Sequence, residues 1–257
     1  MMQAMTQVAV QPRQSPPPVR LRWVFIAAAV AFAALLVAGL TIWVVASRGG
    51  DRTHSIAAPV GDRQEAQLDV AGGATTVTVR VEDLGEDLYR ITTPEESETV
   101  PSIVDGGQFR GERGLRLELS GGGPGVVDIR LSDRVLWSLR FSGGADHIEA
   151  QLGAARLSLV DFTGGTHTID LTLPPPTGEL PVRMSGGVDR FAVHVPPKTA
   201  ARVDAGGGAG TVTLDGVSHL GVIRGGASAT DDWITAKDRY AIYCTAGMSV
   251  FMLDRTQ

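Results

Sequence analysis

Pairs of small residues recur through most of the chain at a nearly constant spacing. From Gly121 onward, the first members of successive pairs lie 22, 21, 22, 21, 18 and 21 residues apart. A fixed period of this length is typical of a stacked repeat architecture. The pairs are Gly72-Gly73, Gly121-Gly122, Gly143-Gly144, Gly164-Gly165, Gly186-Gly187, Gly207-Gly208, Gly225-Gly226 and Ala246-Gly247.

Apolar residues alternate with polar ones on both sides of these pairs. They recur four and two positions before the first member, and again five and seven positions after it. Because successive side chains of a strand point to opposite faces, each unit is predicted to be a strand, a tight glycine corner with positive φ angles, and a second strand. The predicted inward residues include Leu68, Val70, Leu117, Leu119, Val127, Ile129, Leu139, Phe141, Ile148, Ala150, Val160, Phe162, Phe191, Ile242, Cys244 and Phe251.

The predicted fold is therefore all-β: a glycine-cornered β-solenoid of about 20–22-residue units over residues 66–257, with units stacked in chain order. One outward position supports this stacking, because its charge alternates over five units. The residues at this position are Glu118, Arg140, Asp161, Arg183 and Asp204.

Two segments depart from the repeat. Residues 82–114 interrupt the period and are predicted to add one or two strands. The Gly225 unit, with Arg224 at an apolar position, is predicted to contain a bulge or loop.

A single apolar segment precedes the repeat. Residues 23–46 carry no charge, and 24 helical residues at about 1.5 Å each exceed the roughly 30 Å hydrocarbon core, which predicts one transmembrane helix. The competing interpretation is a signal peptide cleaved before Ser47, but the segment is longer than signal cores of about 7–15 residues. Flanking arginines favour an N-terminus inside the cell, with 1–22 as a disordered cytoplasmic tail, 47–65 as a linker and an extracytoplasmic C-terminal domain.

Several short motifs within residues 66–257 carry a family resemblance. The order LDVAGG, DLYR, WSLRFSGG, LTLPPP, VRMSGG, VHVPP and TAARVDAGGGAGTVTLDG resembles the bacterial toastrack family of extracytoplasmic β-solenoids. That family includes the C-terminal domain of LiaF-type cell-envelope stress proteins, adhesin-like domains of unknown function and single-pass actinobacterial relatives. The resemblance implies a domain with no assigned enzymatic activity. Some LiaF-type proteins modulate a membrane histidine kinase, but these usually have several spans.

Composition and motifs exclude several function classes. The formal net charge of −5 argues against a nucleic-acid binder. The single cysteine, Cys244, excludes disulfide scaffolds and multi-thiolate zinc sites, and its inward position predicts a buried, unreactive thiol. The glycine-rich stretches at 121–125 and 206–210 lack the residues of a phosphate-binding loop. The sequence predicts no cofactor and no enzyme.

One acidic set remains as a candidate metal site. Asp128, Glu149 and Asp170 occupy the same outward position on three units, where a hard cation such as calcium is one way to relieve repulsion between neighbouring carboxylates. Solvated side chains or flanking arginines are the alternatives. A second candidate lies beside the corners, where turn chemistry is the simpler explanation. Its residues are Asp146, His167 and Asp189.

Three functions are consistent with these features. The first is a membrane-anchored extracytoplasmic interaction or sensing module that binds a membrane signalling protein or an envelope polymer. The second is a polysaccharide-active β-helix enzyme that uses the acidic set with Arg130 or Arg140. The third is a structural or adhesin-like stalk that self-associates through an exposed terminal rung after Phe251.

Overall fold

The computed structural model describes residues 53–94, 97–109, 112–121 and 125–255. All of them belong to one compact unit, Asp51–Gln257. The predicted tail at 1–22 and the predicted span at 23–46 lie outside the described residues. No helix within the described ranges has the length and apolar character needed to cross a membrane.

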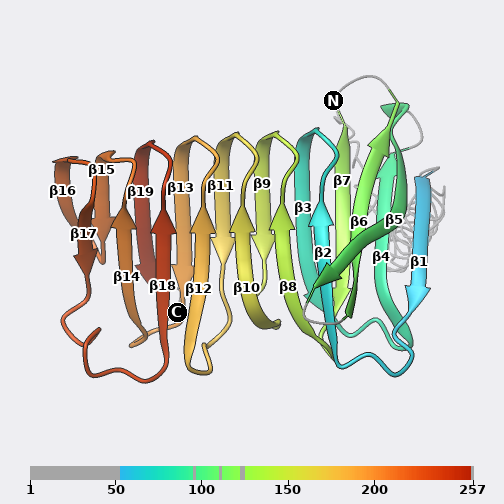
Figure 1. Cartoon of the computed structure of the whole chain (residues 1–257), viewed down its shortest axis with the longest axis horizontal. Coiled ribbons are helices and arrows are strands. Elements are labelled where there is room, and N and C mark those ends of the chain that lie inside the picture. The colour runs from blue at the N-terminus through green and yellow to red at the C-terminus, as the bar shows by residue number, and fades with distance from the viewer. Residues whose placement is uncertain (1–52, 95–96, 110–111, 122–124, 256–257) are drawn as a thin grey trace, which may run out of the picture. The chain divides into compact units, whose positions relative to one another are not determined.

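The unit consists of two sheets that lie one behind the other (Figure 1). Sheet A has ten strands, in the spatial order β1 (Thr53–Pro59), β4 (Asp87–Pro94), β7 (Val126–Ser132), β3 (Ala74–Glu82), β9 (Ala145–Gln151), β11 (Thr166–Thr172), β13 (Val188–Val195), β19 (Met248–Arg255), β15 (Ala209–Leu214) and β16 (Val217–Val222). Sheet B has nine, in the order β17 (Gly226–Ala229), β14 (Ala200–Ala205), β18 (Arg239–Cys244), β12 (Glu179–Met184), β10 (Arg156–Phe162), β8 (Leu136–Phe141), β2 (Glu65–Val70), β6 (Glu112–Ser120) and β5 (Val100–Phe109). This part of the chain is all-β and matches the predicted solenoid class.

Each coil of the solenoid places one strand in each sheet, joined by a glycine corner. The coils are β6/β7, β2/β3, β8/β9, β10/β11, β12/β13, β18/β19 and β14/β15, and neighbouring coils pair in parallel. Antiparallel strands cover the two ends of this stack: β1, β4 and β5 at one end, β16 and β17 at the other. The ends are therefore built differently from the coils between them.

The predicted stacking in chain order is wrong. The β2/β3 coil precedes β6/β7 in the chain, yet it lies between β6/β7 and β8/β9. The last coil of the chain, β18/β19, lies between β12/β13 and β14/β15 (Figure 1). Every unit offers its neighbours the same apolar strands and glycine corner, so the local pattern allows more than one order.

The predicted inward residues form one continuous core, and nearly all of them are buried. Phenylalanine rings from four adjacent coils contact one another along it: Phe141 stacks on Phe162, with ring centres 4.9 Å apart, and Phe191 meets Phe162 and Phe251 edge to face. The predicted register fails in β6. Leu68 and Val70 were expected to align with Leu117 and Leu119, but in the structure they pair with Leu115 and Leu117. A two-residue shift keeps the same face of the strand inward, so alternation alone does not detect it.

The predicted positive φ angles are present at Gly121, Gly208 and Gly225, but the glycines of the regular corners are required for a different reason. Gly143, Gly164 and Gly186 do not have positive φ angles. A Cβ added to them would lie 2.2, 2.2 and 2.0 Å from the carbonyl oxygen of the first glycine in the adjacent coil's corner. Close approach of stacked backbone therefore selects glycine here.

The irregular segments form the end strands. Residues 82–114 contribute β4 and β5, which confirms the predicted strands, and part of the predicted linker forms β1, which pairs with β4. The Gly225 unit departs from the template, as predicted, but it forms no coil. Its strands, β16 and β17, run antiparallel to β15 and β14 and cover the β14/β15 coil at the end of the stack.

Candidate functional site

The three carboxylates of the predicted cation site all lie on the outer face of sheet A, but not on three adjacent strands. Glu149 and Asp170 are direct neighbours on β9 and β11. Asp128 on β7 is separated from Glu149 by Thr78 of β3, because the β2/β3 coil is inserted there. The structure therefore brings together only two of the three.

These carboxylates have protein partners. Asp128 lies 3.3 Å from Arg80 Nη1 and 3.6 Å from Arg130 Nε. Glu149 accepts a hydrogen bond from Gln151, and Asp170 lies 3.1 Å from His194 Nε2. In the part of the chain that the structure describes, no group of three or more His, Cys, Asp or Glu side chains is arranged to hold a metal ion. Cation binding by this set stays a prediction from the sequence.

His194 connects three strands of sheet A. Its Nε2 faces Asp170 on β11, and its Nδ1 lies 2.5 Å from Asp254 on β19. A neutral imidazole has a single N–H donor, so only the protonated ring can donate to both carboxylates. His194 was not among the candidate site residues predicted from the sequence.

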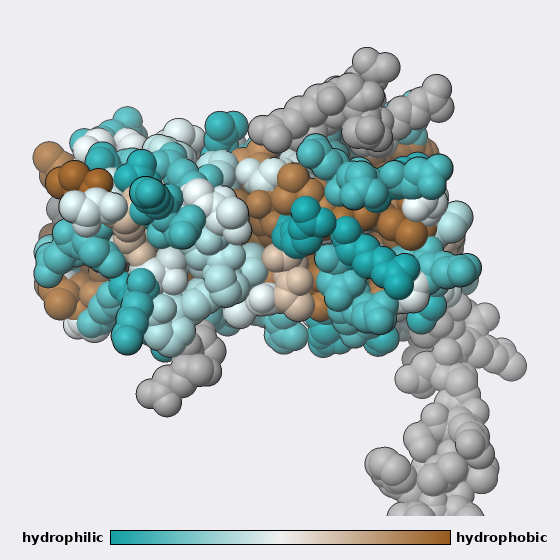
Figure 2. All heavy atoms as spheres, turned by 90° about the horizontal axis from the view of Figure 1, so that it is seen from below, coloured by the Kyte–Doolittle hydropathy of each residue, from teal (hydrophilic) through white to brown (hydrophobic). Residues whose placement is uncertain are grey.

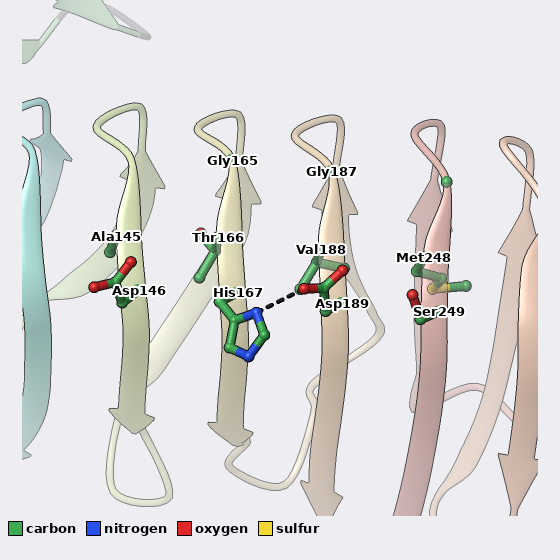
Figure 3. Close-up of a pocket in the computed structure, with 11 residues that line it drawn as sticks. Ala145, Asp146, Gly165, Thr166, His167, Gly187, Val188, Asp189, Met248 and Ser249 are labelled. Carbon is green, nitrogen blue, oxygen red and sulfur yellow. Dashed lines mark hydrogen bonds and ion pairs between the residues drawn. The ribbon is translucent and has the colours of Figure 1, made fainter.

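The second candidate set lies beside the corners, in an open cavity of about 640 Å³ on β9, β11, β13 and β19. His167 Nδ1 is 2.6 Å from Asp189 Oδ2, and Figure 3 shows the imidazole turned toward Asp189, with Asp146 on the strand to the other side. Both partners of the pair are mostly exposed to solvent. An exposed pair of this kind contributes little to stability, and it is consistent with the polar turn chemistry expected beside a corner.

The predicted burial of Cys244 is confirmed. Its side chain is in the core, where desolvation and the nearby charge of Asp204 raise the pKa of the thiol to about 12. The thiol therefore stays protonated at neutral pH, which excludes it as a nucleophile. Of the two arginines considered for an acidic groove, Arg130 lies beside Asp128, whereas Arg140 lies on the opposite sheet.

The alternating charged row on the outer face of sheet B exists, with a different membership. The inserted coils and the shift in β6 change which side chains are neighbours. In spatial order the row is Arg116, Asp69, Arg140, Asp161, Arg183, Tyr243 and Asp204. Glu118 is excluded from the row, whereas Arg116, Asp69 and Tyr243 are additions that the predicted order did not contain.

Apolar side chains are exposed at the end of the stack formed by β16 and β17, which we call the open end. Val217, Leu220 and Ile223 are 61%, 80% and 78% exposed, and Figure 2 shows apolar residues among hydrophilic ones at this end. The exposed terminal rung was expected after Phe251, which is buried inside the stack. The departure of the Gly225 unit from the repeat was the sequence signal for this end.

Comparisons with known proteins identify the fold but no family. No protein-family model matches the sequence, and no curated protein matches it. The structure is similar to that of a "putative cell adhesion protein" from Clostridium sporogenes, with 14% identity, a TM-score of 0.58, and coverage of 80% of this chain and 99% of that one. A "putative adhesin" from Bacteroides fragilis matches with 9% identity and a TM-score of 0.24, covering 80% of this chain and 98% of that one. At these identities, the first similarity shows a shared fold.

Proposed function

We propose that this chain is a membrane-anchored, extracytoplasmic and non-enzymatic interaction module of the adhesin type. The observation that carries the proposal is the open end, where a sheet edge and large apolar side chains face solvent. An unpaired sheet edge that exposes large apolar side chains is typical of an interaction site. The description of the Clostridium sporogenes protein as a cell adhesion protein supports the same function.

The position of the open end fits an anchored module. β1, the first described strand after the predicted span at 23–46, lies at one edge of sheet A, and β16 lies at the other edge. The chain therefore enters the two sheets at the edge opposite the open end, which is consistent with an anchor that precedes β1 in the sequence.

The two lysines of the chain provide a test of topology. Lys198 and Lys237 are exposed, and both lie in the proposed extracytoplasmic domain. In intact cells, we expect a membrane-impermeant amine reagent to label both lysines and to leave the N-terminal amine unmodified, as mass spectrometry would show. Labelling of the N-terminal amine alone would reverse the orientation, and a Lys198→Arg, Lys237→Arg variant gives the background.

A role in cell-envelope stress sensing, which the resemblance to LiaF-type proteins implies, is the finer part of this proposal. Crosslinking in native membranes, with an affinity tag after Gln257, tests it. Capture of a sensor kinase would support the sensing role. Capture of only the same chain or of wall polymer would limit the function to adhesion or structure.

The open end also favours self-association as a second function. β16 carries no Asp, Glu, Lys or Arg side chain, and the adjacent Asp215 is paired with Arg255 at 2.7 Å. Two copies of the strand can therefore pair antiparallel without like charges meeting, whereas natural edges are commonly protected by charges. Gly221, with φ of 64°, limits the regular edge to Val217–Leu220.

We expect Leu220→Lys to convert a dimer of the full-length protein in detergent to a monomer, because the added charge would be buried in the paired edge. Light scattering after size-exclusion chromatography measures the mass. Ile234→Lys is the matched control, since Ile234 is 87% exposed but lies outside β16. A wild-type monomer at all concentrations, or a dimer that survives Leu220→Lys, would exclude self-association through this edge.

A further inference from the structure

A second surface, separate from the open end, has the features of a ligand site. A groove of about 650 Å³ lies on the outer face of sheet B, over β10, β12 and β18, which are neighbours in Figure 1. Three members of the charged row cross it in register: Asp161, Arg183 and Tyr243. Beside them runs a column of hydroxyl side chains, formed by Thr163, Ser185 and Thr245.

The carboxylates of this groove are already paired. Asp161, only 7% exposed, accepts from Arg140 Nε at 3.3 Å. Glu179, at the other end of the groove, lies 2.8 Å from Arg239 Nη2. These ion pairs compensate the negative charge of both acids.

Arg183 is the exception in this row. Its side chain is exposed and has neither an ion pair nor a hydrogen bond among the described residues. Its neighbour on one side, Asp161, forms an ion pair with Arg140. Its neighbour on the other side is Tyr243. Beyond Tyr243, Asp204 pairs with Arg202 of its own strand at 2.7 Å.

The interleaved coil order creates this imbalance. Without β18, Arg183 on β12 would face Asp204 on β14, and the alternation of charge would continue. Because β18 is inserted, an uncharged aromatic side chain takes that place. The groove therefore combines an uncompensated guanidinium with a phenol ring that is 39% exposed.

These groups match one class of ligand. A guanidinium binds a carboxylate through two parallel N–H donors, and an exposed aromatic ring offers an apolar face with a polar tip. Hydroxyl side chains both donate and accept, as the hydroxyls of a sugar require. The hydroxyl of Ser185 has no hydrogen-bond partner among the described residues. A pyranose that carries a carboxylate would use all three kinds of group together.

We propose that this groove binds a carboxylate-bearing sugar residue of an anionic polysaccharide, with the carboxylate on Arg183, the sugar ring against Tyr243 and sugar hydroxyls on the hydroxyl column. The inference rests on the proposed function, because it names the polymer that an extracytoplasmic interaction module of this kind would meet. It does not depend on the open end. An acidic peptide would also satisfy Arg183, but a polymer such as polyglutamate has no sugar ring to lie against Tyr243.

The test measures binding of the full-length protein in detergent to alginate, a polymer of uronic acids. Arg183→Gln should weaken alginate binding at least about tenfold, because it removes a charge-assisted pair. Tyr243→Ser should weaken it about fivefold through loss of the aromatic face. Isothermal titration gives the dissociation constants, and unchanged thermal midpoints show that the variants are folded.

The control variant is Arg190→Gln. Arg190 lies on β13 of the same coil, is exposed and has no ion-pair partner among the described residues, but it faces outward from the opposite sheet. Unchanged alginate binding by this variant supports the groove, whereas equal weakening by both arginine variants would show nonspecific attraction and overturn the proposal.

Two further polymers separate charge from sugar. Dextran, a neutral polymer, and polyglutamate, a carboxylate polymer without sugar rings, should both bind much more weakly than alginate. Equal binding of polyglutamate would reduce the site to an anion site, and equal binding of dextran would remove the role of Arg183; either result overturns the proposal. No binding of alginate would do the same, and lysine labelling and edge pairing would still test the proposed function independently.

Discussion

Replacement of Gly186 by alanine is expected to lower the thermal midpoint of the full-length protein by about 6–12 °C. The added Cβ would lie 2.0 Å from the carbonyl oxygen of Gly164 and 2.5 Å from its carbonyl carbon, and both atoms belong to backbone that cannot turn away. Overpacking of this kind costs about 3 kcal/mol, and each kcal/mol lowers the midpoint of a unit of this size by about 2–4 °C. Circular dichroism during heating measures the change.

Gly187 is the matched control in the same corner. A Cβ at Gly187 would meet nothing within 4 Å, and its backbone is outside the left-handed region. Gly187→Ala should leave the midpoint unchanged, or raise it slightly through the lower entropy of the unfolded chain. Equal losses of stability at Gly186 and Gly187 would mean that the corners do not approach as the structure describes.

Deletion of residues 239–257 is expected to unfold more of the chain than it removes. The deleted residues form β18 and β19, which pair with β12 and β13 on one side and with β14 and β15 on the other. Their loss also removes Phe251, Ile242 and Cys244 from the core. We expect residues 200–229, which form the β14/β15 coil and the end strands β16 and β17, to lose their structure as well.

Hydrogen exchange of the full-length and shortened chains measures this loss of structure. Amides of β14 and β15 should be protected in the full-length protein and should exchange freely after the deletion. Amides of β8 and β9, several coils away, are the internal reference. If β14 and β15 stayed protected in the shortened chain, the coils would stack in chain order and the interleaved arrangement would be wrong.

The fold class was predictable because its signals are local. Alternation identified inward residues such as Phe162 and Ile148, and the small-residue pairs placed the corners, since both patterns act within one unit. The order of the coils was not predictable in this way. Leu139 and Phe141 of β8 would complete the core as well against one neighbouring coil as against another, so the choice depends on contacts that are distant in the sequence.

The candidate sites were likewise predictable where they depend on coils adjacent in the chain, and not where they depend on the order of the coils. Spacing correctly placed Glu149 beside Asp170, which come from coils that are adjacent in both chain and space. It misplaced Asp128, and it missed the register pairing of Arg183 with Tyr243, because each involves an inserted coil. The exposure of Leu220 at the open end required knowing that β16 turns back along β15 rather than starting a new coil.

The interleaved coil has a mechanical consequence when tension acts between the two ends of the stack. Tension between the two ends pulls neighbouring coils apart along the hydrogen bonds that join them. The four residues 196–199, which include Pro196 and Pro197, connect β13 directly to β14 and so pass across the inserted β18/β19 coil. This covalent link must span two strand spacings, about 10 Å, and also pass from sheet A to sheet B, so four residues leave it little slack and limit how far the coils on either side can separate. The inserted β18/β19 coil is therefore held between the β12/β13 and β14/β15 coils. At this point the covalent chain resists the applied force together with the hydrogen bonds between strands.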